Sequence, residues 1–193
     1  MENMLEIRWH GRGGQGSKTA AILLAKIAAA SGNYVQAFPE YGPERMGAPV
    51  LAYTRVYNKP IHVHCQIEKP DLVIVLDPTL IGTVDVTANL IEGGDVIINT
   101  EHNPVELREE LGLAEYINLY TVDANSISEE TIGRIFPNTP MLGALNRVTD
   151  WIDNSNFIEL ARSELNKKFS HKPEVIEGNI RAIDRAYREV QGL

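Results

Sequence analysis

The sequence predicts a three-layer α/β/α domain with a mostly parallel, mixed sheet and a helical C-terminal part. Three observations predict this fold class. Several apolar runs of strand length, such as residues 71–77, are nearly continuous, as in strands buried on both faces. Helical segments separate these runs, which is typical of parallel strands joined by crossovers. The chain has 193 residues and is 44% hydrophobic, so we expect a single domain over residues 1–193 with a sizeable core.

The chain is predicted to open with a strand, a helix and a second strand. Residues 5–10 form a short apolar run, and residues 15–31 are rich in Ala and Leu with apolar positions at helical spacing. Gly32-Asn33 ends this helix, because glycine adopts the conformation of a helix C-terminus without strain. Residues 34–38 follow as the second strand. Residues 39–49 contain three prolines and two glycines, which predicts an irregular loop.

A hairpin is predicted after this loop. Residues 50–58 alternate and are rich in β-branched and aromatic side chains, and a turn is expected at Asn58-Lys59-Pro60. Residues 61–65 would pair back onto this strand and make the sheet mixed. His62 and His64 would share one face of the returning strand. They bring too few ligands together to predict a metal site.

The second half of the chain is predicted to supply the parallel strands and the C-terminal helices. Buried strands are expected over residues 71–77, 94–100 and 117–123. After residue 138 the chain is expected to be helical throughout, over residues 141–151, 156–169 and 174–190. Ser126 and Glu129 form a capping box before a further helix. Asp77 and Asp123 end strands and suit helix N-caps, while Gly143 permits the close approach of a neighbouring element.

Composition limits the classes of function. The formal net charge is −8, which argues against a general nucleic-acid binder, because such proteins need a dominant basic surface. Cys65 is the single cysteine. One thiol, which we expect to be buried, cannot hold an iron–sulfur cluster that needs about four thiolates. No apolar run approaches the roughly 20 residues of a membrane span, and no signal peptide is visible. We expect a cytoplasmic protein without membrane association.

The stretch HGRGGQGSKT, residues 10–19, indicates a loop that binds an anion. Gly11, Gly13 and Gly16 satisfy G-x-G-x-x-G between a strand and a helix, as in dinucleotide and phosphate loops. Glycines let the backbone approach an anion, and N–H groups at the helix start donate to it. The stretch also carries side chains that offer positive charge or hydroxyl donors: Arg12, Ser17, Lys18 and Thr19.

Two departures separate this loop from common nucleotide sites. Ser17 stands between Gly16 and Lys18, whereas a Walker A loop places the lysine directly after the glycine. The acid nearest to a ribose-binding position is Glu40, which lies inside the proline-rich loop. Three interpretations stay open: an anion-binding loop, a stand-alone Rossmann-type NAD(P)-dependent dehydrogenase, and glycines that only permit tight packing.

Three stretches taken together resemble the gamma subunit of the 2-oxoacid:ferredoxin oxidoreductases. They are HGRGGQG (residues 10–16), YGPERMGAPV (residues 41–50) and NTPMLGAL (residues 138–145). The resemblance extends from residue 7 to the C-terminal helices. The form of the second stretch is similar to that of members acting on pyruvate or branched-chain 2-oxoacids. Met46 stands where many relatives carry a second arginine.

The resemblance implies a subunit of a heterotetrameric enzyme. The family oxidatively decarboxylates a 2-oxoacid with coenzyme A, giving an acyl-CoA, carbon dioxide and reduced ferredoxin. It implies alpha, beta and delta partner subunits that hold thiamine diphosphate, Mg and [4Fe-4S] clusters. No cofactor, metal site or catalytic residue is expected in this chain. The isolated chain is expected to be inactive.

The candidate site combines the first two stretches. The residues expected to contact a cofactor are Gly11, Arg12, Gly13, Gly14, Gln15, Gly16, Ser17, Glu44 and Arg45. Both stretches are expected to lie together at the carboxyl ends of the strands, where open α/β sheets place ligands. Backbone donors of residues 13–16, with Arg12 and Arg45, would face an anionic group. That group could be the phosphates of coenzyme A or a carboxylate of a partner subunit.

Overall fold

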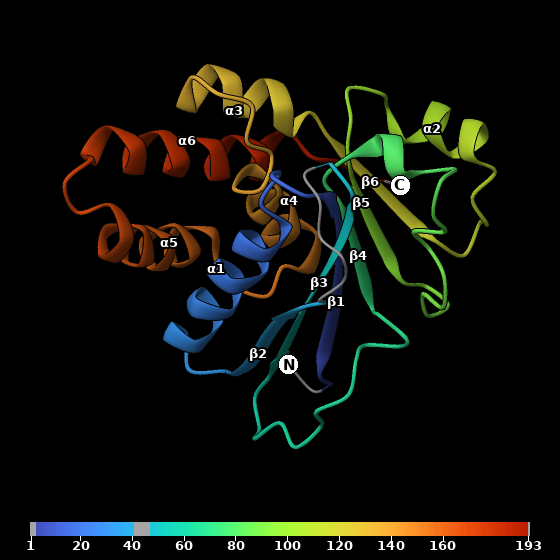
Figure 1. Cartoon of the computed structure of the whole chain (residues 1–193), viewed down its shortest axis with the longest axis horizontal. Helices are drawn as coiled ribbons and strands as arrows, with labels where there is room; N and C mark the ends of the chain where they lie inside the picture. Colours follow the sequence, from blue (N-terminus) through green and yellow to red (C-terminus); the bar gives the residue numbers. More distant parts are fainter. Residues whose placement is uncertain (1–2, 41–46, 193) are drawn as a thin grey trace.

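The computed structural model describes residues 3–40 and 47–192. In this part of the chain seven strands form one sheet in the order β2-β3-β1-β4-β5-β6-β7 (Figure 1). The strands are β1 (Leu5–Arg12), β2 (Tyr34–Pro39), β3 (Pro49–Tyr57), β4 (Leu72–Val75), β5 (Asp95–Asn99), β6 (Asn118–Val122) and β7 (Gln191–Gly192). The helices are α1 (Ser17–Ala30), α2 (Pro104–Leu111), α3 (Ala124–Ile132), α4 (Pro140–Thr149), α5 (Asn154–Phe169) and α6 (Pro173–Glu189), with a 3-10 turn η1 (Pro78–Leu80). The predicted fold class is confirmed.

The centre of the sheet is parallel and its flanks are antiparallel. β1 pairs in parallel with β4, and parallel pairing continues through β5 to β6. On its other side β1 pairs with the antiparallel strand β3, which also pairs with β2. β7 lies antiparallel to β6. The predicted mixed sheet is therefore confirmed, but its antiparallel part comes from β7 and from β2 and β3, the strands on either side of the proline-rich loop.

The predicted hairpin between β3 and residues 61–65 is wrong. β3 pairs with β1 along one edge and with β2 along the other, so neither edge is free for a further strand. Residues 61–65 form an irregular connection whose carbonyl groups accept hydrogen bonds from the sheet. The carbonyl of Val63 accepts from Gln36 Nε2 (2.8 Å), and that of Cys65 accepts from Arg55 Nη1 (2.8 Å). The side chain of Cys65 is exposed, contrary to the prediction of a buried thiol.

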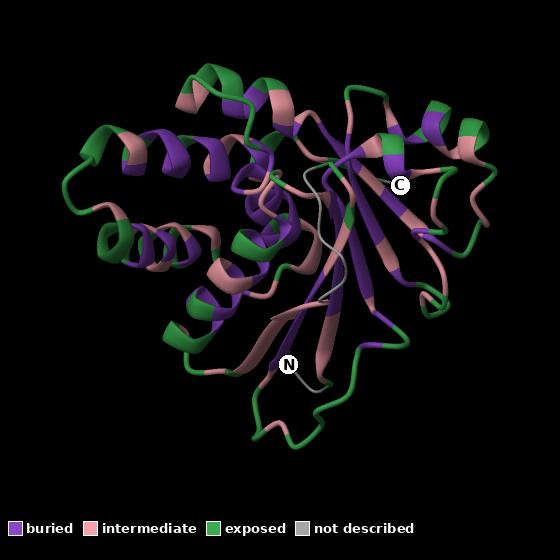
Figure 2. Ribbon diagram, viewed as in Figure 1, coloured by how far each residue is buried: buried purple, intermediate pink, exposed green. Residues whose placement is uncertain are grey.

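Two apolar clusters cover the two faces of the sheet. The larger lies beneath α1, α3, α4, α5 and α6 and includes Trp9, Leu24 and Phe157. The smaller lies on the opposite face, beneath η1 and α2, and includes Val73 and Val96. Figure 2 shows buried residues concentrated along the central strands and on the inward sides of the helices. The helices thus form one thick layer and one thin layer around the sheet.

Two helix predictions need correction. α3 begins at Ala124, because the carboxylate of Asp123 caps it by accepting from Ser126 N–H (2.9 Å). Ser126 and Glu129, the predicted capping box, therefore lie inside the helix, whereas the N-cap predicted at Asp123 is confirmed. The chain is not helical to its end, since Gln191–Gly192 pair with β6. None of the described helices combines the length and apolar character needed to cross a membrane.

α4 approaches α6 closely at Gly143. A Cβ at this position would lie 2.0 Å from the carbonyl oxygen of Ile183. Any side chain would therefore force the two backbones apart, and the predicted close approach at Gly143 is confirmed. This contact brings the two central C-terminal helices together over the larger apolar cluster.

We expect Gly143→Ala to lower the free energy of unfolding by about 1–3 kcal/mol, because overpacking displaces α6. The loss should appear although alanine is about 1 kcal/mol more favourable than glycine in a helix. Arg147→Ala, a change at an exposed position of the same helix, is the control and should cost well below ~1 kcal/mol. Denaturant unfolding measures both values. A more stable Gly143→Ala variant would contradict the close approach.

Candidate functional site

The glycine-rich loop lies at the carboxyl end of β1, where open α/β sheets bind ligands. Gly14 and Gly16 have φ angles of 100° and 87°, which residues with a side chain rarely adopt. The N–H of Gly13 donates to the carbonyl of Ala48 (2.9 Å), and the N–H of Gly47 donates to the carbonyl of Gly13 (3.2 Å). The loop therefore lies beside the described end of the second stretch, as the sequence predicted.

The side chain of Arg12 binds groups of its own chain. Its Nε lies 3.2 Å from Oδ2 of Asp77, and its Nη2 donates to Thr79 Oγ1 (2.9 Å). Its Nη1 donates to the carbonyl of Gly47 (3.1 Å). Gln15 Nε2 donates to the same oxygen of Asp77 (2.6 Å), while Gln15 Oε1 accepts from the N–H of Arg12 (2.7 Å). Two of the predicted anion-binding residues thus share an internal carboxylate.

Asp77 has a wider role than its sequence position indicates. Its Oδ1 accepts from the N–H (2.9 Å) and Oγ1 (2.6 Å) of Thr79, which confirms the predicted N-cap, here of η1. Burial raises the pKa of the Asp77 carboxyl, but hydrogen bonds from Thr79 and Gln15 and the charge of Arg12 more than offset this effect. The pKa of Asp77 therefore lies below its usual value, and a carboxylate joins β4 to the loop. The sequence could have indicated the contact between Asp77 and the loop, because β1 and β4 were both predicted strands and parallel pairing brings their carboxyl ends together.

Two close approaches hold the loop against its surroundings. A Cβ on Gly11 would lie 2.2 Å from Oγ of Ser17, which is itself buried. A Cβ on Gly16 would lie 2.9 Å from Nδ2 of Asn138. Asn138 opens the third stretch of the sequence resemblance, so all three stretches meet at this loop. Asn138 was not among the predicted site residues. Its position in the third stretch could have indicated that it lies at the site.

The start of α1 faces the loop without a side-chain cap. Gly16 occupies the N-cap position in the left-handed conformation, and within the described residues no side chain accepts a hydrogen bond there. The positive end of the helix dipole at this position favours an anion. The loop thus offers backbone donors, while Asp77 neutralises much of the charge of Arg12.

His10, the first residue of the glycine-rich stretch, lies on the opposite face of β1 from Trp9. His10 is buried, and its Nε2 accepts from Arg8 Nε (3.0 Å), so the proton of the neutral ring is on Nδ1. Arg8 also donates to the carbonyls of Val86 (3.0 Å) and Ala88 (2.7 Å). Burial, and then the charge of Arg8, lower the pKa of His10 to about 4. His10 is therefore neutral near pH 7 and orders the sheet beneath the loop.

Among the other residues singled out in the sequence, His62 and His64 do not join this site. Glu44 and Arg45 lie outside the described residues. His62 and His64 are exposed on the irregular connection after β3. β3 begins beside the glycine-rich loop at Pro49 and ends at Tyr57, and the two histidines follow this distant end.

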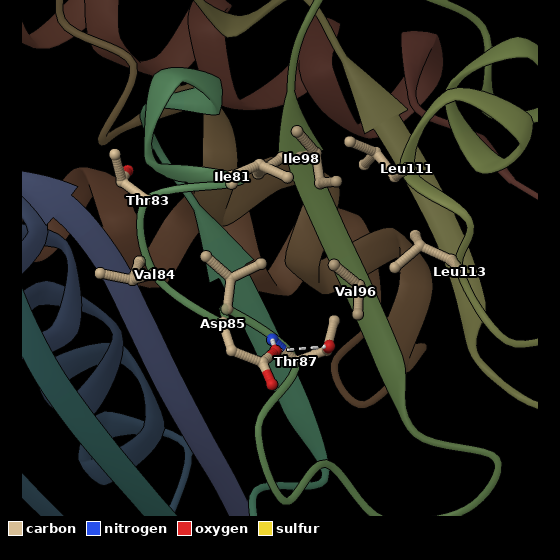
Figure 3. Close-up of a pocket in the computed structure, with 11 residues that line it drawn as sticks. Ile81, Thr83, Val84, Asp85, Thr87, Val96, Ile98, Leu111 and Leu113 are labelled. Atoms are coloured by element: carbon tan, nitrogen blue, oxygen red, sulfur yellow. Dashed lines mark hydrogen bonds between the residues drawn. The ribbon is translucent and has the colours of Figure 1, made fainter.

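A separate hollow of about 320 Å³ lies on the thin side of the sheet, beneath η1 and α2 (Figure 3). Its lining is mostly apolar, with Ile98 on β5 and Leu111 at the end of α2. The carboxylate of Asp85 accepts from the N–H (3.1 Å) and Oγ1 (2.9 Å) of Thr87. None of the predicted site residues that the structure describes borders this hollow, so we treat it separately from the candidate site.

The loop and its neighbouring stretches match a known family along most of the chain. The sequence pattern described as pyruvate ferredoxin/flavodoxin oxidoreductase matches residues 6–189. The chain belongs to this oxidoreductase family. Among its oxidoreductase relatives is the "Pyruvate/ketoisovalerate oxidoreductases common subunit gamma" of Pyrococcus abyssi. That protein is 47% identical over 188 residues, which cover 97% of this chain and 98% of the relative.

Solved structures of oxidoreductases agree with this assignment. The crystal structure of pyruvate oxidoreductase subunit PORC from Thermotoga maritima matches with a TM-score of 0.85 and 40% identity, covering 99% of both chains. A 2-oxoglutarate:ferredoxin oxidoreductase from Magnetococcus marinus has the same fold, with a TM-score of 0.77 and 21% identity. That match covers 97% of this chain and 31% of the other, so the fold forms one part of a longer chain there.

These relatives give no support to a stand-alone Rossmann-type dehydrogenase. In the usual dinucleotide-binding sheet the first strand has parallel neighbours on both sides. In this oxidoreductase chain β1 has the antiparallel strand β3 on one side. The carboxylate of Glu40, the acid weighed for ribose binding, accepts a hydrogen bond from the hydroxyl of Tyr53 (2.8 Å).

Acid is expected to destabilise the fold through His10. Because the pKa of His10 is lowered from 6.5 to about 4, the unfolded chain binds a proton in this pH range that the folded chain does not. The free energy of unfolding should therefore fall by roughly 3 kcal/mol between pH 6.5 and 4 through this residue. His10→Gln should flatten the pH dependence, whereas His171→Gln, at an exposed position, should not. Denaturant unfolding across this range measures the effect, and equal slopes in the two variants would refute it.

Proposed function

We propose that this chain is the gamma subunit of a multi-subunit 2-oxoacid:ferredoxin oxidoreductase in the cytoplasm. The sequence identity of 47% to the gamma subunit of Pyrococcus abyssi and of 44% to PorC of Thermotoga maritima, each over nearly the whole chain, carries this proposal. The complex would decarboxylate pyruvate or a related 2-oxoacid, transfer the acyl group to coenzyme A and pass two electrons to ferredoxin. Carbon dioxide and an acyl-CoA are the other products.

The redox chemistry would belong to other subunits. The sequence contains one cysteine, whereas a [4Fe-4S] cluster takes about four thiolates. Within residues 3–40 and 47–192 no group of three or more His, Cys, Asp or Glu side chains is placed to hold a metal. We therefore assign thiamine diphosphate, its Mg²⁺ ion and the clusters to alpha, beta and delta subunits. Ferredoxin would bind the assembled complex.

The glycine-rich loop would contact coenzyme A. Its phosphates are anions of the kind that N–H groups at a helix start bind. The N–H groups of Gly13 and Gln15 already donate to carbonyl groups, so Gly14 and Gly16 would supply the donors beside α1. The side chain of Arg12 is 29% exposed, so its guanidinium remains reachable although Asp77 partly neutralises it. A carboxylate of a partner subunit is the alternative ligand, and the same chemistry would bind it.

Coenzyme A affinity of the assembled enzyme tests this role. Arg12→Ala should weaken coenzyme A binding about tenfold, which corresponds to about 1.4 kcal/mol for a lost charged contact. Asp77→Asn is the matched control, because it disturbs the same network but leaves the cation, and its affinity should equal or exceed that of the wild type. Calorimetric titration measures both. Unchanged affinity in Arg12→Ala would remove coenzyme A as the ligand of Arg12.

Purification from the native host tests the subunit assignment. The tagged chain should bring down chains that carry thiamine diphosphate and iron, and the complex should oxidise a 2-oxoacid with coenzyme A. The chain expressed alone should be colourless and inactive, because it lacks the cluster ligands. Metal analysis and absorption spectra measure this difference. Turnover of a 2-oxoacid by the isolated chain would contradict the proposed function.

A further inference from the structure

A groove of about 650 Å³ runs from the glycine-rich loop along α1 toward the ends of α5 and α6. α1, α5 and α6 lie side by side in this part of the molecule (Figure 1). The connection between α3 and α4 forms the remaining wall. Four basic side chains line this groove, which we call the basic groove: Lys26, Arg134, Lys168 and Lys172.

The charge of the basic groove is opposite to that of the whole chain. The chain carries a net charge of −8, yet Glu164 is the acid in the lining of the groove. Glu164 is buried and pairs with Lys167, so it does not neutralise the basic side chains that line the groove. Among the described residues no ion pair engages these four side chains. All four are exposed, so the groove presents unneutralised positive charge.

Apolar side chains accompany the charge. Phe136 lines the groove and is 40% exposed, and its neighbour Ile135 is 58% exposed. The N–H of Phe136 donates to Oγ of Ser128 (2.9 Å), which fixes this connection to α3. Phe169 lines the opposite side, with Nζ of Lys168 5.2 Å from its ring centre. A ligand would therefore bury aromatic surface as well as pair with cations.

The spacing of the charges favours an extended ligand. Gly16 and Lys26 border the groove ten residues apart on the same helix, which corresponds to about 15 Å along α1. An extended peptide covers that length with about four or five residues. One phosphate group would contact only part of a groove of this length. Several carboxylates along a peptide match it better.

We propose that the basic groove docks an acidic segment, bearing at least one apolar side chain, of a partner subunit of the same oxidoreductase. The inference rests on the proposed function, because it requires partner chains. Charge complementarity steers and aligns such a segment, and burial of Phe136 and Phe169 contributes apolar contact. The groove and the glycine-rich loop then have different ligands although they share a border.

Charge reversal in the groove tests the docking. Lys168→Glu combined with Lys172→Glu should weaken binding of the gamma chain to its purified partner subunits at least tenfold and flatten the salt dependence. Phe136→Ser should also weaken binding but leave the salt dependence unchanged. Lys59→Glu combined with Lys69→Glu is the matched control, because both lysines are exposed on the connection after β3 and the change in net charge is identical. Calorimetry at two salt concentrations measures the affinities, and thermal unfolding verifies that each variant is folded.

Three results would overturn the proposal. Equal subunit affinity in the groove variant and the control shows that the groove docks no partner. Intact assembly with weakened coenzyme A binding makes the groove a nucleotide site, and a change confined to self-association makes it a contact between two copies of this chain. In each case the wild-type complex still forms, so the proposed function stands. A wild-type chain that binds no partner subunit overturns both.

Discussion

The carboxylate of Asp77 joins three parts of the molecule that are separate in sequence. It accepts hydrogen bonds from Gln15 in the glycine-rich loop and from Thr79 in η1, and it pairs with Arg12 at the end of β1. These contacts are possible because β1 and β4 are parallel neighbours whose carboxyl ends coincide. The side chain of Asp77 is thus the common acceptor for Arg12 and Gln15.

The glycines of the loop permit this arrangement. Gly11 makes room for Ser17, and Gly16 makes room for Asn138 of the distant third stretch. The N–H of Gly13 donates to the carbonyl of Ala48, the residue before β3, and so extends the pairing of β1 with β3. Close packing and the proposed anion binding are therefore compatible in this loop, since the packing orders its backbone N–H groups.

The charged side chains of the structure fall into internal pairs and an exposed basic groove. Its buried charged groups are paired internally: Arg8 with His10 and two carbonyl groups, and Arg55 with Glu6. Exposed basic side chains also gather along the basic groove beside α1. An acidic chain with this distribution can attract anions at one place while its overall charge repels polyanions elsewhere.

The sequence by itself determined what depends on local patterns. The apolar runs identified β4, β5 and β6, the helical spacing identified α1 and the C-terminal helices, and three short stretches identified the family. Only the tertiary structure decided which elements meet. It showed that β3 has no free edge for residues 61–65, that Cys65 is exposed, and that Arg12 faces an acid of its own chain. Periodicity reports on neighbours along the chain, whereas strand pairing and ion pairs join residues that are tens of positions apart.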